Sequence, residues 1–532
     1  MMLLWVLAIL VAGGILAWAA GRLDDRLPRW VAAGALGADL VLIAAFWISH
    51  YRAVSLLGSP SWLIEHRSDW IPRFGASFHL ALDGLSLILV ALTVFLGLLA
   101  VLASSPDVRT RSGFYHFNLL WALAGIVGVF LAADLLLFYF FWELMLVPMY
   151  FLIGIWGHEK RISASFKFLL FTQAGGLAML LSILAIYFIH GRASGVYTFD
   201  YAALAGTPLG GAAPWVLLGF LLAFLVKAPG VPLHTWLPDA HAQAPTAASV
   251  ILAGLLLKTG AYGLIRFALP LSPSALRAFA PFGMAIGVAG ILYGAKLAFA
   301  QSDLKRMVAY TSVSHMGFVL LGIFSLDGTA LQGVVLQIVC HGISTGALFI
   351  LAGAIQERLR TRELRAMGGL WGAAPRMGAA TLIFALASLG LPGLGNFAAE
   401  FLILVGTFRS APVFAVLAAL GLVASTIYAL GLFQRIFFGP RSAEAPFRDL
   451  SPRETGVLAA LALAIVWLGL YPQPVLDTSR AAVEGIRSAA MTGPGQGIAS
   501  TLPASPSDVR SARTHVAGRS TDQAAPVKGD RL

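Results

Sequence analysis

Long apolar runs separated by short polar segments divide this sequence from its first residues to about residue 471. Each run holds about twenty residues, the length that an α-helix needs to cross the hydrocarbon core of a bilayer. The pattern predicts about 14 transmembrane helices, approximately at residues 2–20, 30–48, 82–103, 114–132, 134–156, 165–190, 214–236, 245–269, 278–300, 304–325, 328–355, 376–408, 412–438 and 455–471. The predicted fold class is therefore all-α, a polytopic membrane protein.

Two of these spans contain proline and glycine well inside the apolar run. The interruptions are Pro229, Gly230 and Pro232 in the seventh span, and Pro392, Gly393 and Gly395 in the twelfth. Such residues free backbone carbonyl groups, which inside a bilayer only protein or water can satisfy. We therefore predict that helices 7 and 12 are broken.

The two interruptions also resemble each other. Residues 228–232 read APGVP, and residues 391–395 read LPGLG. The two spans are five apart, an odd number, so equivalent helices would run in opposite directions. This relationship is typical of an inverted repeat of two five-helix units, in which broken helices build an ion-binding site.

Composition supports a membrane protein and removes several functional classes. Of 532 residues, 58% are hydrophobic and 11% are charged, and the net charge is +11. Most Arg and Lys residues lie in short loops between spans, so nucleic-acid binding is not expected. No GxGxxG motif precedes a helix and no P-loop is present, which argues against a nucleotide site. The single cysteine, Cys340, leaves no disulfide framework and no cysteine-ligated metal or cluster.

The basic residues also predict the orientation. The odd-numbered loops hold eighteen Arg and Lys residues and the even-numbered loops hold seven. The positive-inside rule then places the first loop in the cytoplasm and both termini on the outer, periplasmic side. No Lys or Arg precedes the first apolar run, which favours a retained span over a cleaved signal peptide.

A few ionisable residues remain well inside the predicted spans once the loops are set aside. A lysine at mid-bilayer costs at least roughly 2.5 to 3.5 kcal/mol, so such residues are expected to face protein or water and to be functional. They are Asp39, Glu143, Lys227, Lys258, His315, His341 and Glu400. Lys167 and Lys296 lie nearer the cytoplasmic ends and can extend to the interface. Asp83 and Asp134 begin their spans, where a carboxylate caps a helix.

Glu143 and Lys227 are predicted to interact. Glu143 lies within FYFFWELMLVPMY, and Lys227 ends an apolar run directly before the first interruption. A carboxylate beside a lysine favours the charged form of both groups. A static ion pair that fixes helix register is the alternative, although buried pairs contribute little to stability. Because Lys227 borders the broken backbone, we favour a role in ion transfer.

The remaining groups suggest a proton relay. Lys258 has no carboxylate within four residues and is expected to share a cavity with water or with other spans. His315 and His341 lie mid-span; each alone would be as readily structural, but two histidines near two lysines favour a relay. Neither has a carboxylate or second histidine at i+3 or i+4, so no metal site is expected. Glu400 is interpreted as a terminal proton acceptor, and Asp39 is not assigned to the path.

Four stretches of the sequence resemble a known family. They are WLPDAHAQAPTAASVILAGLLLKTGAYGLIRF, FWELMLVPMYFLIG, DLKRMVAYTSVSHMGFV and LPGLGNFAAEF. They are similar to the antiporter-like membrane-arm subunits of the proton-translocating NADH-quinone oxidoreductase, respiratory complex I, and in particular to its chain M group. The resemblance covers about residues 80–440. It implies fourteen spans with two inverted five-helix repeats.

This resemblance divides the chain into five segments. They are residues 1–110 with helices 1–3, residues 111–270 with the first repeat (helices 4–8), residues 271–440 with the second inverted repeat (helices 9–13), residues 441–475 with helix 14, and residues 476–532, a polar tail predicted to be disordered.

The resemblance also implies a role for each candidate residue. Glu143 and Lys227 correspond to the coupled ion pair and Lys258 to the central lysine. His315 and His341 correspond to the connecting histidines, and Glu400 to the terminal site. Sister antiporter-like chains carry lysine at the position of Glu400, which favours the M group. Asp39 and Lys296 are not part of the family motif.

The function implied is proton pumping across the membrane, coupled to electron transfer from NADH to quinone in other subunits. This chain is expected to hold no cofactor and no metal, while NADH, FMN, iron-sulfur clusters and quinone belong to partner subunits. Its partners would be the other membrane-arm subunits, including two sister antiporter-like chains, in a hetero-oligomer in the bacterial inner (plasma) membrane.

Other functions are compatible with parts of the sequence. The nearest alternative is a subunit of a multi-subunit sodium/proton antiporter, followed by the membrane subunit of a proton-pumping hydrogenase. A scaffold with inert buried charges is a further possibility. A membrane acyltransferase is disfavoured, because no serine, cysteine or carboxylate pair stands at helical spacing from a plausible base.

Overall fold

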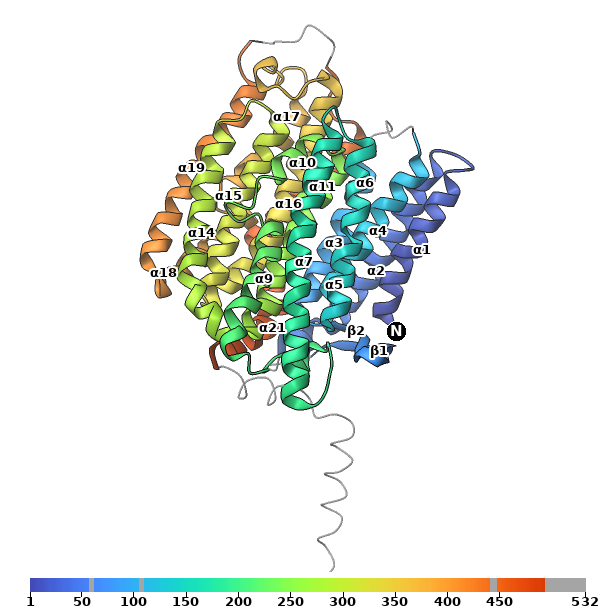
Figure 1. The fold of residues 1–532 in the computed structure, drawn as a ribbon. Coiled ribbons are helices and arrows are strands. Elements are labelled where there is room, and N and C mark those ends of the chain that lie inside the picture. Colours follow the sequence, from blue (N-terminus) through green and yellow to red (C-terminus); the bar gives the residue numbers. More distant parts are fainter. Residues whose placement is uncertain (57–61, 105–109, 441–446, 493–532) are drawn as a thin grey trace, which may run out of the picture.

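The computed structural model describes residues 1–56, 62–104, 110–440 and 447–492. These residues form helices that lie side by side in one bundle (Figure 1), which confirms the all-α prediction. Thirteen helices of the described part are long and apolar enough to cross a membrane. The polytopic membrane fold is therefore confirmed.

The N-terminal helices lie at one side of the bundle. They are α1 (Met2–Ala20), α2 (Leu27–Leu56), α3 (Gly84–Ala103) and α4 (Ser112–Leu131). In α3 and α4, 78% and 83% of the apolar window is buried, whereas in α1 and α2 the buried share is only 39% and 22%. Helices α1 and α2 therefore cover α3 and α4, and Figure 1 shows the first two in blue at the edge.

The next helices lead to the first predicted break. They are α5 (Leu135–Leu144), α6 (Leu146–Trp156), α7 (Arg161–Ser194), α8 (Tyr201–Leu204), the short turn η2 (Gly210–Ala212) and α9 (Ala213–Lys227). Helix α9 ends at Lys227, and non-helical turns follow until α10 (Leu237–Gln243). The chain is thus interrupted at Pro229, Gly230 and Pro232, as the sequence predicts.

The span that follows is entirely surrounded by protein. It runs without a gap through α11 (Thr246–Ile251), η3 (Leu252–Leu256), α12 (Leu257–Gly263), η4 (Leu264–Ala268) and α13 (Leu269–Leu271). Its apolar window is 100% buried. The turns η3 and η4 are π-helical, a conformation that is rare and often occurs at functional sites.

The second half of the chain contains the second break. Its elements are α14 (Pro273–Phe299), α15 (Leu304–Phe324), α16 (Gly328–Leu359), η5 (Leu364–Ala366), α17 (Pro375–Ser388), α18 (Gly395–Ser410), α19 (Pro412–Phe437) and α20 (Pro452–Leu470). Helix α17 has 14 residues and α18 has 16, so neither half of the predicted twelfth span is long enough to be counted among the thirteen.

A two-stranded sheet interrupts the helical pattern between α2 and α3. Strands β1 (Ile64–Ile71) and β2 (Ala76–Leu82) pair antiparallel, joined by the turn η1 (Pro72–Phe74). Gly75 has φ +67, and a Cβ there would lie 2.0 Å from the carbonyl oxygen of Tyr197, so only glycine fits. The sequence analysis does not predict this hairpin.

The predicted disordered tail is partly wrong. Residues 476–492 belong to helix α21 (Gln473–Thr492), and residues 493–532 lie outside the described part of the chain. Apolar side chains such as Val475, Val483 and Ile486 are buried, and α21 packs across α3 and α16. The tail was predicted from average composition, which conceals a helical stripe of apolar residues.

Helix α21 and the β-hairpin lie at the same end of the bundle (Figure 1), which we call the hairpin end. A Cβ on Gly84, the first residue of α3, would lie 1.7 Å from the carbonyl oxygen of Thr478. Trp47 also donates a hydrogen bond to the Thr478 hydroxyl over 3.0 Å. The backbone of α21 is therefore in direct contact with the start of α3.

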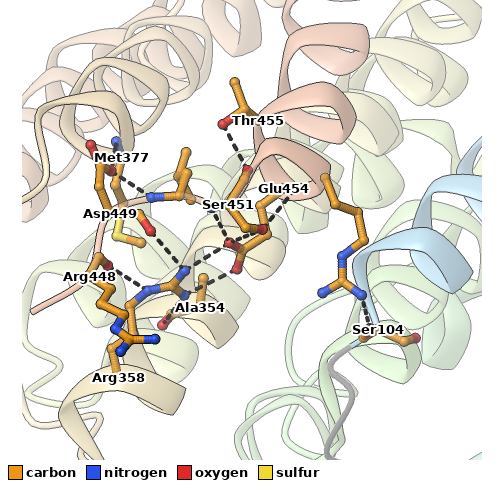
Figure 2. A network of polar contacts seen from close by, with 11 residues as sticks. Ser104, Ala354, Arg358, Met377, Arg448, Asp449, Ser451, Glu454 and Thr455 are labelled. Carbon is orange, nitrogen blue, oxygen red and sulfur yellow. Dashed lines mark hydrogen bonds and ion pairs between the residues drawn. The ribbon is translucent and has the colours of Figure 1, made fainter.

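A polar network joins three helices at the opposite end of the bundle (Figure 2). Arg358 of α16 donates to both carboxylate oxygens of Glu454, over 3.1 and 2.8 Å. Glu454 and Ser451 form a capping box at the start of α20. The carboxylate of Asp449 accepts the backbone N–H groups of Arg376 and Met377 at the start of α17. These contacts fix the ends of α16, α17 and α20 to one another.

Candidate functional site

Four of the predicted site residues form a row of contacts in the interior. Nζ of Lys258 in α12 hydrogen-bonds Nδ1 of His341 in α16. The ring of His341 lies 5.6 Å from that of His315 in α15, measured between centroids. Nδ1 of His315 is 2.8 Å from Oε1 of Glu400 in α18. All four side chains are at most 2% exposed.

Lys258 is held by an unusual part of its own helix. Its Nζ donates to the carbonyl oxygen of Ala253 over 2.9 Å, and Ala253 lies in the π-helical turn η3. Among the described residues, no carboxylate lies within ion-pair distance of Lys258. The amine is thus positioned between a carbonyl and an imidazole, and the imidazole is a group to which it can transfer a proton.

The other end of the row lies against the second helix break. Oε1 of Glu400 accepts a hydrogen bond from Gln337 over 2.8 Å, besides its contact with His315. Nε2 of His315 lies 3.0 Å from the hydroxyl of Ser388, the last residue of α17, and 3.3 Å from the hydroxyl of Tyr428. Helix 12 is therefore interrupted directly beside the predicted terminal site.

Glu143 and Lys227 lie near each other without touching. Their charges interact, but no ion pair within 4.0 Å joins them, and Nζ of Lys227 has no hydrogen-bond partner among the described residues. The Lys227 ammonium instead faces the rings of Trp142 and Phe168, 5.4 and 5.5 Å from their centroids. Such distances allow cation–π attraction.

Glycine residues position this pair. A Cβ on Gly176 of α7 would lie 2.3 Å from Oε1 of Glu143, so α7 approaches the carboxylate closely. A Cβ on Gly260 of α12 would lie 2.6 Å from the backbone nitrogen of Ala228 and 2.9 Å from Cβ of Lys227. The backbone of Lys227 therefore packs against the helix that carries Lys258.

Two basic residues that the sequence analysis did not assign lie beside the row. His241 of α10 is fully buried, and its ring stacks on Phe349 with centroids 4.4 Å apart. Lys305, which the sequence analysis counted with the loops, is 1% exposed and donates to the carbonyl oxygen of Ala244 over 3.1 Å. The charges of Lys258 and Lys305 both act on His241. The signal available in the sequence was a histidine directly after the first break.

Lys305 also lines a cavity at the end of the bundle opposite the hairpin, the cavity end. This cavity has a volume of about 410 Å³, and its walls include Ser104, Tyr115, Trp156, His158, Lys305 and Gln356. Burial, together with the charges of Lys305 and Arg362, lowers the pKa of His158 to about 4. His158 is thus neutral at pH 7.

Three ionisable residues of the predicted spans lie away from the row. Lys167 forms an ion pair of 2.7 Å with Asp239, which also binds Arg306 over 2.5 Å. Lys296 is exposed. Asp39 is fully buried in α2, and neither of its carboxylate oxygens has a hydrogen-bond partner among the described residues.

Within the described part of the chain, no group of three or more His, Cys, Asp or Glu side chains is arranged to hold a metal ion. Cys340 is buried and free.

Comparison with known proteins gives the family. Residues 132–427 match the family described as NADH:quinone oxidoreductase/Mrp antiporter, transmembrane. The NADH-quinone oxidoreductase subunit M of Pseudomonas aeruginosa is 54% identical over 498 residues, covering 92% of this chain and 97% of the relative. The subunit M of Escherichia coli (strain K12) is 50% identical over 497 residues, covering 92% and 98%.

A solved structure agrees with these relatives. A chain of respiratory complex I from Thermus thermophilus with bound NADH superposes with a TM-score of 0.81 at 33% identity, covering 92% of this chain and 99% of that one. This chain therefore belongs to the NADH:quinone oxidoreductase/Mrp antiporter family, and within it to the M subunits of NADH-quinone oxidoreductase, the antiporter-like subunits of respiratory complex I.

Proposed function

We propose that this chain translocates protons as an antiporter-like subunit of NADH-quinone oxidoreductase, driven by electron transfer from NADH to quinone in other subunits. The observation that carries this proposal is the buried row Lys258, His341, His315 and Glu400, which four different helices bring into contact. Each of these side chains can gain and lose a proton. Buried ionisable groups in a membrane protein are characteristic of proton relays.

The row supplies the steps of a transfer. The Lys258 ammonium hands a proton to Nδ1 of His341, with which it is in contact. An imidazole accepts a proton on one ring nitrogen and releases one from the other, so each histidine can pass a proton onward. Nε2 of His341 has no hydrogen-bond partner among the described residues, so the step between the two rings requires a bridging water or a ring rotation. His315 then delivers to Glu400, whose Oε1 lies 2.8 Å away. Glu400 is the proposed terminal acceptor.

Glu143 and Lys227 form the proposed switch. A carboxylate in contact with the ammonium stabilises its charged form, and separation withdraws that stabilisation. Moving one charge against about 200 mV requires roughly 4.6 kcal/mol, at about 2.3 kcal/mol per 100 mV. Desolvating or re-pairing one buried amine changes its protonation free energy by a comparable amount. Separation of the two residues therefore promotes release of the lysine proton, and re-pairing resets the site.

The cavity end supports a route for protons to Lys258. The cavity wall contains Lys305, and the charges of Lys305 and Lys258 both act on the buried His241. In the orientation predicted from the basic loops, this end faces the cytoplasm and both termini lie in the periplasm. The cavity then opens on the side from which a respiratory pump takes protons.

The redox chemistry is proposed to lie outside this chain. NADH, FMN, iron-sulfur clusters and quinone would be held by partner subunits, and two sister antiporter-like chains would adjoin this one in the inner membrane. The two inverted five-helix repeats, at residues 111–270 and 271–440, would place one broken helix in each half.

Membranes from cells that carry variants of this chain test the proposal. Glu143→Gln or Lys227→Ala should lower NADH-driven acidification of inverted vesicles while the complex still assembles. Lys296→Ala, at an exposed lysine outside the row, is the matched control and should pump normally. Full pumping in either Glu143→Gln or Lys227→Ala would contradict the proposal.

The sodium/proton antiporter alternative predicts a different result. Pumping that depends on NADH, ignores an imposed sodium gradient and co-purifies with flavin and iron-sulfur subunits supports complex I. Proton movement that follows the sodium gradient without NADH would support the antiporter instead.

A further inference from the structure

A buried ion pair lies between Lys258 and the hairpin end. Arg266, at the end of the same span, pairs with Asp83, the residue that caps α3. Arg266 is 4% exposed and Asp83 is 6% exposed. The position of Arg266, eight residues after Lys258, places it about 12 Å further along the helix axis. The proton relay proposed above does not use this pair.

Aromatic rings enclose the guanidinium. Its central carbon lies 5.1 Å from the ring centroid of Trp62 and 5.5 Å from that of Tyr262. Tyr262 stands on the same helix, one turn from Lys258 and one turn from Arg266. The Tyr262 hydroxyl donates its hydrogen bond to the carbonyl oxygen of Phe130 over 3.1 Å, so the hydroxyl proton is held by the backbone. A charged group and two rings therefore fill the space directly beyond Lys258.

An arginine in this position has a specific effect on protons. A guanidinium keeps its proton under all physiological conditions, so it cannot pass one on. A lysine or histidine at the same place would extend the relay instead.

A pump needs such a barrier. In the route proposed above, protons reach Lys258 from the cavity end by way of Lys305, which lines the cavity, and His241, on which the charges of Lys305 and Lys258 both act. A second open path from Lys258 to the hairpin end would let protons flow back across the membrane without passing Glu400. We propose that the ion pair of Arg266 with Asp83, enclosed by Trp62 and Tyr262, is a proton barrier that closes the hairpin end of the Lys258 site. This inference rests on the proton-translocating function proposed above.

The alternative is a static ion pair that only holds α3 against the fully buried span. Asp83 caps α3 through its other oxygen, Oδ1, which accepts the backbone N–H of Ser86 over 2.9 Å. The cap therefore needs no arginine. Replacing a buried ion pair by neutral residues is often tolerated, whereas removing one partner leaves an unpaired buried charge. A paired substitution separates the two interpretations.

The test uses the whole purified complex in proteoliposomes without NADH, so that no pumping occurs. A potassium gradient with valinomycin imposes a membrane potential, and an enclosed pH dye measures passive proton entry. The double variant Asp83→Asn with Arg266→Gln removes both charges and leaves neither unpaired. We expect its proton permeability to rise severalfold, because amide side chains replace a guanidinium that never releases its proton.

Two further variants complete the test. Arg266→Lys keeps the positive charge but replaces the guanidinium by an amine that can release its proton, so this variant should leak more than the wild type. Trp62→Ala, at a partly exposed ring, should raise the permeability to a smaller extent and serves if the double variant does not assemble. Wild-type tightness of the double variant or of Arg266→Lys would overturn the proposal.

Failure of this inference is distinguishable from failure of the proposed function. Glu143→Gln should lose NADH-driven pumping and remain passively tight. If Glu143→Gln pumps normally, the proposed function fails. If it does not pump and the double variant is tight, only the barrier fails.

Discussion

The two charged regions of the interior are built in opposite ways. In the row from Lys258 to Glu400, hydrogen bonds join Lys258 to His341 and His315 to Glu400, and the two imidazole rings lie 5.6 Å apart between centroids. Gln337, Ser388 and Tyr428 hold the far end of the row by hydrogen bonds. Glu143 and Lys227 are separated, and the ammonium lies against aromatic rings. A row of closely spaced ionisable side chains is suited to conduct protons along a fixed path. A separated pair of charges is suited to change state, because small movements alter its energy strongly.

The largest expected effect comes from breaking the row. Lys258→Met keeps the side-chain volume approximately and removes the amine that contacts His341. Since a positioned proton-transfer group contributes about 10²-fold or more, we expect NADH-driven acidification to fall to about a hundredth of wild type. Fluorescence quenching of a pH dye in inverted vesicles measures this, with the amount of assembled complex as the control. Pumping above about half of the wild-type rate would show that the contact with His341 does not conduct.

The second prediction addresses the separated pair through its packing. Gly176→Ala would place a methyl group 2.3 Å from Oε1 of Glu143, so the carboxylate must move. Overpacking of this kind costs about 1–3 kcal/mol. We expect a loss of pumping of about tenfold without loss of the row. Gly34→Ala is a matched control, because no atom lies within 4 Å of its added Cβ. Equal pumping in both variants would mean that the position of Glu143 is not critical.

The third prediction sharpens the role of the aromatic rings. Trp142→Leu removes the ring that lies 5.4 Å from the Lys227 ammonium. A desolvated cation–π contact is worth about 1–2 kcal/mol, so the separated state should become less favourable. We expect turnover to fall by about fivefold to tenfold, while Trp215→Leu, at an exposed ring, should change nothing. An unchanged rate in Trp142→Leu would indicate that the ring only fills space.

The smallest expected effect is a pH dependence at the cavity end. The pKa of His158 is about 6.5 in the unfolded chain. In the folded protein, burial and the charges of Lys305 and Arg362 together lower it to about 4. As the pH falls, His158 takes up a proton in the unfolded chain before it does so in the folded protein. The free energy of unfolding is therefore unaffected by His158 above about pH 6.5 and decreases as the pH falls toward 4. The melting temperature of the purified complex should therefore fall less between pH 7 and pH 5 in His158→Gln than in the wild type.

Much of the fold could be predicted because each membrane span has a local sequence pattern of its own. An apolar run of about twenty residues indicates a span without any information about the neighbouring helices. Proline with glycine inside such a run indicates a helix break. The predicted spans accordingly lie within a few residues of the helices. The β-hairpin was missed, because β1 reads IEHRSDWI and carries no clear alternation of buried and exposed residues. Helix α21 was missed because polar residues dilute its apolar stripe.

The candidate site is different, because its contacts join residues far apart in the chain. The sequence singles out His315 and Glu400 as buried groups, but nothing in their spacing predicts a distance of 2.8 Å between them. His241 and Lys305 were not assigned for the same reason. A lysine at the start of α15 reads as a loop residue until the packing of α10 against α15 buries it. Their neighbourhood is a property of helix packing, which single-sequence patterns do not encode.

The position of α21 restricts the movement of α3 relative to α16. This helix lies across α3 and α16, which are far apart in the sequence, and touches the backbone of Gly84 without an intervening side chain. The two backbones cannot slide past each other without steric repulsion, so α21 holds α3 and α16 together at the hairpin end. We therefore expect any rearrangement during turnover to be smallest at the hairpin end and larger at the cavity end, which α21 does not cross.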